Sequence, residues 1–260
     1  MRRWFIQIVL ALLVCGLALA SLVALGQYFR RHLRDDPRYY FPLAEIECPS
    51  PPGVDRVAFL SEVQYLNGLP EQVSLLDDSL PERLAAAFVR HAWVGRVERV
   101  EIGPGRRIRL QLQFRHPLLA VTFSEKALVT RAVDREGILL PREADIKSLP
   151  VLFGIFPPPA AGPGKPWGDP EVEAAARVAE LVRPHQTELQ LNTMRWTNGI
   201  LRLGRDEFRS GPVVIWGHGP GDEAADEPAA EAKLRRLLDY CRDGSSFQTG
   251  EYDLQIPRDP

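Results

Sequence analysis

The sequence has little cysteine, little histidine and no excess of positive charge. Its 260 residues include three cysteines and five histidines, and 32 lysine and arginine residues face 34 aspartate and glutamate residues, for a net charge of −2. Nucleic-acid binding needs a basic surface, and a metal centre needs ligands at close spacing. The composition therefore predicts no nucleic-acid partner and no metal site.

The three cysteines leave one question open. Cys15 lies within an apolar segment, so only Cys48 and Cys241 remain in the rest of the chain. These two residues form a disulfide in an oxidising compartment or stay as two separate small side chains, and the sequence does not decide between the two.

Motifs for catalysis or for cofactor binding are also missing. Gly217-His218-Gly219-Pro220-Gly221 is rich in glycine, but it contains a proline and precedes an acidic run over 222–227. A loop that holds phosphate opens directly into a helix and usually carries a lysine. No nucleophile-elbow serine and no paired metal-binding histidines are found either. We therefore expect a protein without enzymatic activity, cofactor or small-molecule substrate.

Long apolar runs are absent except at the N-terminus. From Trp4 to Gly26 the chain carries no charged residue. A helix of this length spans roughly 34 Å, enough for a hydrocarbon core of about 30 Å. The run predicts a transmembrane helix, with residues 1–28 as a cytoplasmic tip and membrane anchor. A signal peptide cleaved after Ala20 and a lipoprotein modified at Cys15 are the alternatives. Arginines flank the run on both sides, so charge alone does not orient it.

The rest of the chain alternates between helical and strand patterns. After a linker over 29–42, we expect a strand at 43–47 and a helix at 54–66, and Ser79 and Glu82 predict a capping box for a second helix. Every second residue of 107–114 is apolar, as in a half-buried strand. The order predicts an α+β protein, with a β-α-α-β-β domain at 43–117 and a β-rich domain with two helices at 118–257.

Several short motifs resemble the FtsQ/DivIB cell-division family. They are Trp93-Val94, Arg115-His116-Pro117, Asp134 to Gly137, Leu149-Pro150 to Gly154, and Tyr252-Asp253-Leu254, in the order typical of that family. Ala92 stands where the family usually has proline, and one extra residue precedes Ala120. The resemblance covers about residues 43–257, and it assigns structural roles to Trp93, Val94, Arg115, Pro117, Asp134, Gly137, Pro150 and Gly154.

The resemblance implies a function, a location and partners. It implies a single-pass protein of the cell inner membrane at the division site, with its N-terminus in the cytoplasm and its C-terminal domain in the periplasm. Residues 43–117 would form a POTRA domain, and the whole would act as a non-catalytic scaffold. The implied partners are other divisome membrane proteins: small coiled-coil bitopic proteins and proteins of septal peptidoglycan synthesis.

The resemblance also implies a partner-binding strand. A partner would add a strand to the edge strand Tyr252 to Ile256, which includes Leu254, with Leu234 and Tyr240 on the adjacent helix. The alternative is that this segment is an ordinary core strand. For the whole protein, the alternatives are a membrane-anchored POTRA-like adaptor in secretion or envelope assembly, and a cleaved, secreted enzyme.

Overall fold

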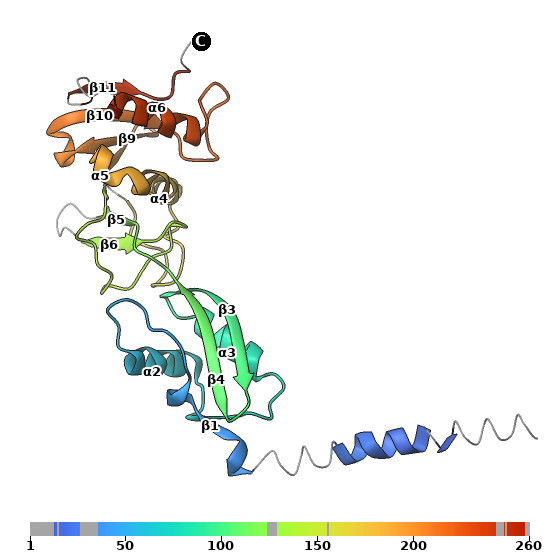
Figure 1. Cartoon of the computed structure of the whole chain (residues 1–260). Coiled ribbons are helices and arrows are strands. Elements are labelled where there is room, and N and C mark those ends of the chain that lie inside the picture. The colour runs from blue at the N-terminus through green and yellow to red at the C-terminus, as the bar shows by residue number, and fades with distance from the viewer. Residues whose placement is uncertain are drawn as a thin grey trace, which may run out of the picture. The chain divides into compact units, whose positions relative to one another are not determined.

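The computed structural model describes residues 13, 14, 16–26, 36–123, 129–154, 156–242, 247 and 249–257. The chain divides into two compact units. The first comprises Met1–Arg90 and Arg96–Gln113, and the second comprises His91–Gly95 and Phe114–Pro260. Figure 1 labels the elements of both units.

The N-terminal segment corrects the expected fold. Among the residues that the structure describes, no helix is both long and apolar enough to cross a membrane. The predicted transmembrane helix from Trp4 to Gly26 is therefore wrong for the described chain, and Trp4 itself lies outside the described residues.

Beyond the helical stretch at 16–26, the described part of the first unit contains two short sheets, two α-helices and two 3-10 helices. Its elements are the 3-10 helix Pro37–Tyr39, β1 (Tyr40–Pro42), the 3-10 helix Leu43–Glu45, α2 (Arg56–Asn67), β2 (Gln72–Ser74), α3 (Leu80–Val89), β3 (Val94–Gly103) and β4 (Arg107–Phe114). β1 pairs with β2, and β3 pairs with β4. Glu47 forms a single parallel bridge to Arg109 of β4.

The strand expected at 43–47 is mostly a 3-10 helix. The side chains of Leu43 and Ile46 are both buried, at 2% and 0% exposure. Buried residues three apart fit a helical turn, whereas a strand would bury every second residue. β2 lies between the two α-helices, so the described unit runs β-α-β-α-β-β, and the predicted β-α-α-β-β order is wrong.

The core of the first unit lies between its helices and β4. Phe59 of α2 meets Phe88 of α3 edge to face, with ring centroids 5.8 Å apart. Ile108 and Leu110 of β4 are buried, and Arg107, Arg109 and Gln111 on either side of them are exposed. The half-buried strand predicted from the alternation at 107–114 is thus confirmed.

The two helices of this unit begin differently. Asp55 caps α2, because its Oδ2 accepts hydrogen bonds from the N–H groups of Val57 and Ala58 at 2.9 and 3.1 Å. Ser79 makes no such bond, so the predicted capping box is wrong. Ser79 already has helical dihedral angles, and its hydroxyl donates to Asp77 at 2.7 Å instead.

The second unit is built on one mixed sheet of seven strands, in the order β11-β10-β9-β8-β7-β5-β6. Its elements are β5 (Leu119–Thr122), β6 (Thr130–Val133), β7 (Val151–Phe153), α4 (Pro170–Val182), the 3-10 helix Arg183–His185, α5 (Gln186–Leu189), β8 (Thr193–Thr197), β9 (Ile200–Arg205), η4 (Asp206–Phe208), β10 (Ser210–Gly217), α6 (Ala230–Arg242) and β11 (Gly250–Asp253). The α+β class is confirmed, but the described part of this unit has three α-helices, where two were predicted.

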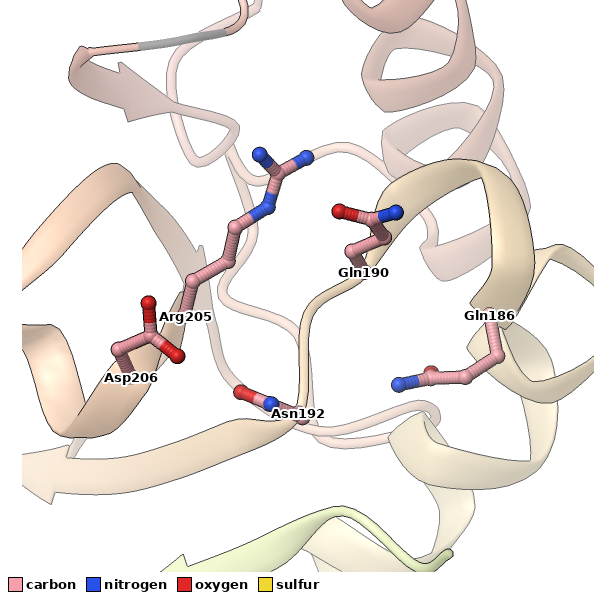
Figure 2. Close-up of a pocket in the computed structure, with 5 residues that line it drawn as sticks. All are labelled: Gln186, Gln190, Asn192, Arg205 and Asp206. Atoms are coloured by element: carbon pink, nitrogen blue, oxygen red, sulfur yellow. The ribbon is translucent and has the colours of Figure 1, made fainter.

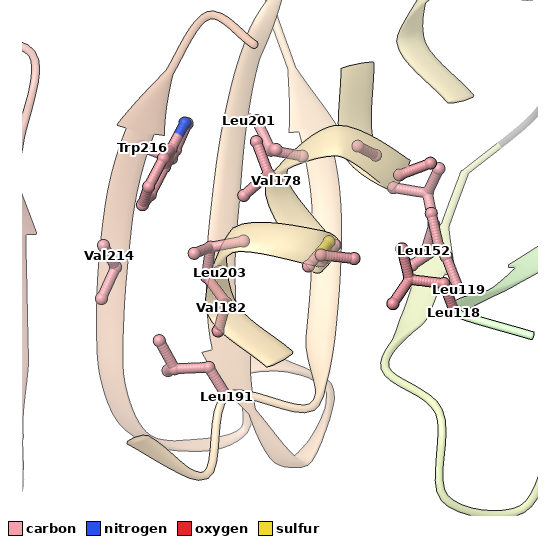
Figure 3. Packing of buried hydrophobic residues seen from close by; sticks show 14 of the residues in the cluster. Leu118, Leu119, Leu152, Val178, Val182, Leu191, Leu201, Leu203, Val214 and Trp216 are labelled. Carbon is pink, nitrogen blue, oxygen red and sulfur yellow. The ribbon is translucent and has the colours of Figure 1, made fainter. Parts of the chain in front are cut away.

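One face of this sheet carries the main core. Val178 and Val182 of α4 point at Leu201 and Leu203 of β9, as Figure 3 shows. Trp216 of β10 is fully buried in the same cluster. Burying one such aliphatic side chain contributes about 1.5–3 kcal/mol. The apolar face of α4 therefore holds this helix on the sheet.

Candidate partner-binding edge

Two of the motifs that resemble FtsQ/DivIB, at Arg115 and at Asp134 to Gly137, meet at a turn in the second unit. Arg115 Nη1 lies 2.5 Å from Asp134 Oδ2 and 3.1 Å from Glu136 Oε2. Asp134 Oδ1 accepts from the N–H groups of Glu136 and Ile138, both at 2.9 Å. The side chains of Arg115 and Asp134 are only 16% and 6% exposed. This arrangement fixes the turn after β6, with the carboxylate of Asp134 buried inside it.

The other motif residues are also part of the framework. Gly137 has φ +71°, and a Cβ there would lie 2.7 Å from Glu173 Cγ. A Cβ on Gly154 would lie 2.5 Å from the ring of Phe156. Glycine is therefore required at both positions, at Gly137 by the dihedral angle as well as by space.

The remaining motif residues flank β5. The N–H of Arg115 donates to the carbonyl of Trp93 at 2.8 Å, and the N–H of Ala120 donates to the carbonyl of Pro150 at 2.9 Å. Trp93 and Val94 are buried, and Pro117 is half-buried just before β5. Their backbone carbonyls and apolar side chains therefore support the strands around β5.

β11 is the edge strand at one end of the seven-stranded sheet. It pairs in parallel with β10, with Glu251 opposite Val213 and Asp253 opposite Ile215. The N–H of Leu254 donates to the carbonyl of Ile215 at 2.9 Å. Because backbone groups alternate in direction along a strand, those of Tyr252 and Leu254 face β10 and those of Glu251 and Asp253 face away from the sheet.

The strand is shifted from its expected position. It runs from Gly250 to Asp253, whereas Tyr252 to Ile256 was predicted. Asp253 Oδ1 accepts from the N–H of Gln255 at 2.8 Å, which turns the chain after Asp253. Leu254 is fully buried, and Ile256 is 63% exposed beyond the strand. The side chain of Leu254 therefore belongs to the core and is not available to a partner.

The predicted helix residues support this strand from one face. Leu234, Tyr240 and Tyr252 are half-buried and pack against the core. The ring of Tyr252 lies 5.2 Å from the ring of Tyr240, and also 5.2 Å from that of Phe247. The aromatic rings therefore hold the edge strand in place. The groups of this edge that a partner can reach are mainly backbone N–H and carbonyl groups.

Sequence reasoning missed Arg236, which connects α6 to the end of β11. Its Nη2 donates to the carbonyl of Asp253 at 3.2 Å, and its Nη1 donates to the carbonyl of Ile256 at 2.5 Å. The carbonyl of Asp253 points away from the sheet, so Arg236 occupies one of the outward groups of the edge. The sequence does not predict this contact, because nothing in the pattern around a helical arginine indicates which carbonyl groups it will bind.

A buried ion pair holds the other end of α6. Lys233 Nζ lies 2.6 Å from Glu227 Oε1, and the two side chains are 0% and 3% exposed. The N–H and Nδ1 of His218 also contact the carboxylate, at 2.9 and 2.7 Å. Burial alone would raise the pKa of Glu227, but the hydrogen bonds from Lys233, Ala224 and His218 lower it to about 2. This carboxylate therefore stays charged and joins the loop after β10 to α6.

The second unit also has a polar pocket, shown in Figure 2. It has a volume of about 340 Å³ and is lined by Gln186, Gln190, Asn192, Arg205 and Asp206. Arg205 donates to the carbonyl of Leu189, and Gln186 donates to that of Leu191, both at 2.9 Å. Three amides, one guanidinium and one carboxylate supply neither a nucleophile with its base nor a set of metal ligands.

The described residues contain no group of three or more His, Cys, Asp or Glu side chains that could hold a metal ion. Cys48 and Cys241 are both free thiols. Burial raises the pKa of each, so both stay protonated at neutral pH.

No model of a known protein family matches the sequence, and no curated protein matches it.

Proposed function

We propose that the protein is a non-catalytic scaffold of the bacterial cell-division machinery. It acts at the inner membrane of the division site, with its two units on the periplasmic side, and it links division proteins through protein–protein contacts. Its partners are small coiled-coil membrane proteins and proteins of septal peptidoglycan synthesis. The basis for this proposal is the ordered set of motifs that resembles the FtsQ/DivIB family.

One structural observation carries the binding part of the proposal. β11 is an edge strand near the end of the described chain, and the backbone of Glu251 and Asp253 faces away from the sheet. A partner strand that pairs with such an edge gains main-chain hydrogen bonds, which give affinity without requiring exposed apolar side chains. Most of the side chains predicted to contact a partner are half-buried. Binding through backbone groups, as in strand addition, does not require those side chains to be exposed.

The cellular role is tested with a fluorescent fusion of the full chain in dividing cells. We expect the fusion to collect at midcell. Fluorescence spread evenly around the envelope of dividing cells would contradict the proposal. Co-purification with secretion or envelope-assembly components, in place of division proteins, would favour the POTRA-like adaptor instead.

The binding mode is tested by a proline on the outward side of β11. Because the N–H of Glu251 faces away from β10, Glu251→Pro removes no hydrogen bond of the sheet, and proline is tolerated on such edges. We expect this variant to lose co-purification of the coiled-coil partner. Glu251→Ala is the matched control, because it removes the same carboxylate but keeps the N–H. Equal binding by both variants would exclude strand addition at this edge.

A further inference from the structure

The free edge of β11 is acidic. Tyr252 and Leu254 lie on the helix-covered face of the sheet, so the alternating side chains of Glu251 and Asp253 lie on the opposite face. Glu251 is exposed and Asp253 is half-buried. Two carboxylates, two residues apart on one strand, therefore flank the backbone groups that face outward.

The stretch of edge that another strand can use is short. The N–H and carbonyl of Glu251 and the N–H of Asp253 face outward, and the carbonyl of Asp253 is occupied by Arg236. Past this point the chain turns, because Asp253 Oδ1 accepts from the N–H of Gln255. A docking strand can therefore pair over about three residues, opposite Glu251, Tyr252 and Asp253.

We propose that the edge of β11 selects an extended partner segment with the pattern basic–apolar–basic. Residues directly opposite each other on paired strands share one face of the sheet, and opposite charges there attract. Lysine or arginine then lies opposite Glu251 and opposite Asp253, and the apolar residue lies beside Tyr252 and the ring of Tyr240. This inference rests on the proposed function and deepens it, because it states the chemistry of the strand that the scaffold receives.

The charges also argue against a second copy of this chain as the occupant. In a symmetric antiparallel pair of β11 strands, the outward residues meet as Glu251 with Glu251, Glu251 with Asp253, or Asp253 with Asp253. Each of these registers places like charges directly opposite each other, which is destabilising. Charged side chains on an edge strand are a common device against self-pairing.

Arg202 of β9 competes for the same carboxylate. Its Nη1 lies 3.1 Å from Glu251 Oε1, and the two side chains are 37% and 56% exposed. Ion pairs this exposed are weak, so an incoming lysine can share or replace the contact. Arg202 therefore weakens the attraction of Glu251 for a basic partner and does not abolish it.

The test uses fluorescent peptides and the purified full chain. We compare Thr-Lys-Val-Lys-Thr with Thr-Glu-Val-Glu-Thr by fluorescence anisotropy. We expect the lysine peptide to bind roughly 3- to 30-fold more tightly, the range for two cross-strand charge pairs, and the difference to shrink at high salt. Equal binding, tighter binding of the glutamate peptide, or no binding of either peptide at millimolar concentration would overturn the inference.

Variants of the protein locate the effect. Glu251→Lys should reduce the preference for the lysine peptide or reverse it. Asp226→Lys is the matched control, because it makes the same change of charge at an exposed loop residue and should leave the preference intact. Arg202→Gln should tighten binding of the lysine peptide about two- to threefold by removing the competing cation. An identical effect of Glu251→Lys and Asp226→Lys would show general charge attraction and exclude the edge.

The outcome is separable from that of the proposed function. Midcell localisation without any peptide preference would contradict only the proposal that β11 selects a basic–apolar–basic segment. A peptide preference without midcell localisation contradicts only the role in division.

Discussion

The two units differ in their best-buried ion pairs, although both also have exposed ones. In the first unit, the pair between Arg109 and Glu47 is 54% and 46% exposed, although the nitrogen and oxygen lie 2.9 Å apart. In the second unit, Lys233 and Glu227 are 0% and 3% exposed. The pair between Arg115 and Asp134 is nearly as well buried.

The difference in ion-pair burial follows from the length of the connections that each unit has to fix. Apolar packing between α2, α3 and β4 defines the first unit, and its exposed ion pairs add little. The second unit has long connections, such as the turn at 134–138 and the loop at 217–229. These connections lack enough apolar side chains to fix them, so buried carboxylates bind their backbone N–H groups instead. Buried carboxylates therefore fix two connections of the second unit, whereas the ion pair between Arg109 and Glu47 in the first unit is exposed.

Glu227→Gln should have the largest effect on this contrast. The change leaves Lys233 charged and buried without its counter-ion, which typically costs about 3–5 kcal/mol. Urea denaturation followed by tryptophan fluorescence measures it, because Trp93, Trp167, Trp196 and Trp216 all lie in the second unit. Glu231→Gln, an exposed residue of α6, is the control. A loss below about 1 kcal/mol would mean that the buried pair does not stabilise the loop.

The same carboxylate should make the second unit sensitive to acid. Its pKa is lowered from 4.5 to about 2, so its contribution is complete above pH 4.5 and is lost as the pH falls toward 2. We expect the urea midpoint of the wild type to fall over this range more steeply than that of Glu227→Gln. Parallel pH profiles for the two proteins would contradict this assignment.

Asp134→Asn should have the next largest effect. Asparagine keeps an oxygen for the N–H groups of Glu136 and Ile138 but loses the charge that faces Arg115. Hydrogen bonds to charged groups contribute about 1.5–3 kcal/mol, so we expect a loss in that range by urea denaturation. Glu136→Gln removes the exposed partner of the same arginine and should cost less than 1 kcal/mol. Equal losses of unfolding free energy in the two variants would show that the exposed contact with Glu136 stabilises the turn as much as the buried contact with Asp134.

The helix caps of the first unit should differ by a smaller amount. Asp55→Ala removes two hydrogen bonds at the start of α2 and should cost about 1 kcal/mol. Ser79→Ala should cost only a few tenths, because the hydroxyl makes no cap bond. Hydrogen exchange of the amides in α2 and α3 reports each helix. A larger loss for Ser79→Ala would restore the capping box that the sequence predicts.

Arg109→Gln should have the smallest effect. The exposed pair with Glu47 should contribute less than 1 kcal/mol, and that contribution should vanish at high salt. Hydrogen exchange of the β4 amides at low and high salt measures it. A salt-independent loss above 1 kcal/mol would show that the first unit also depends on charge.

Local patterns in the sequence were enough for the elements with strict periodicity. The alternation of 107–114 specified β4, in which Ile108 and Leu110 are buried. In α4, Val172, Ala175, Ala179 and Val182 are all buried on one face. Asp169 caps that helix, since its side chain accepts from the N–H of Glu171. In each case the side chains contact neighbours on one face, so spacing along the chain carries the information.

The candidate site depended on contacts that spacing does not encode. Tyr252 and the edge position were predicted from the resemblance, but the strand bounds were shifted, and the buried position of Leu254 was not foreseen. Which backbone groups of β11 face outward depends on its register with β10, and a shift of one residue would exchange them. Arg236 and the buried Lys233 were invisible for the same reason, because their partners lie in other elements.

The sequence by itself determined the α+β class, the main helices and the apolar faces that form the two cores, because these depend on periodicity within one segment. The tertiary structure decided which strand lies at the edge, which carbonyl Arg236 occupies, and that Glu251 and Asp253 are the residues that face outward. Those properties depend on pairing between segments far apart in the chain, and the geometry of the folded sheet sets them.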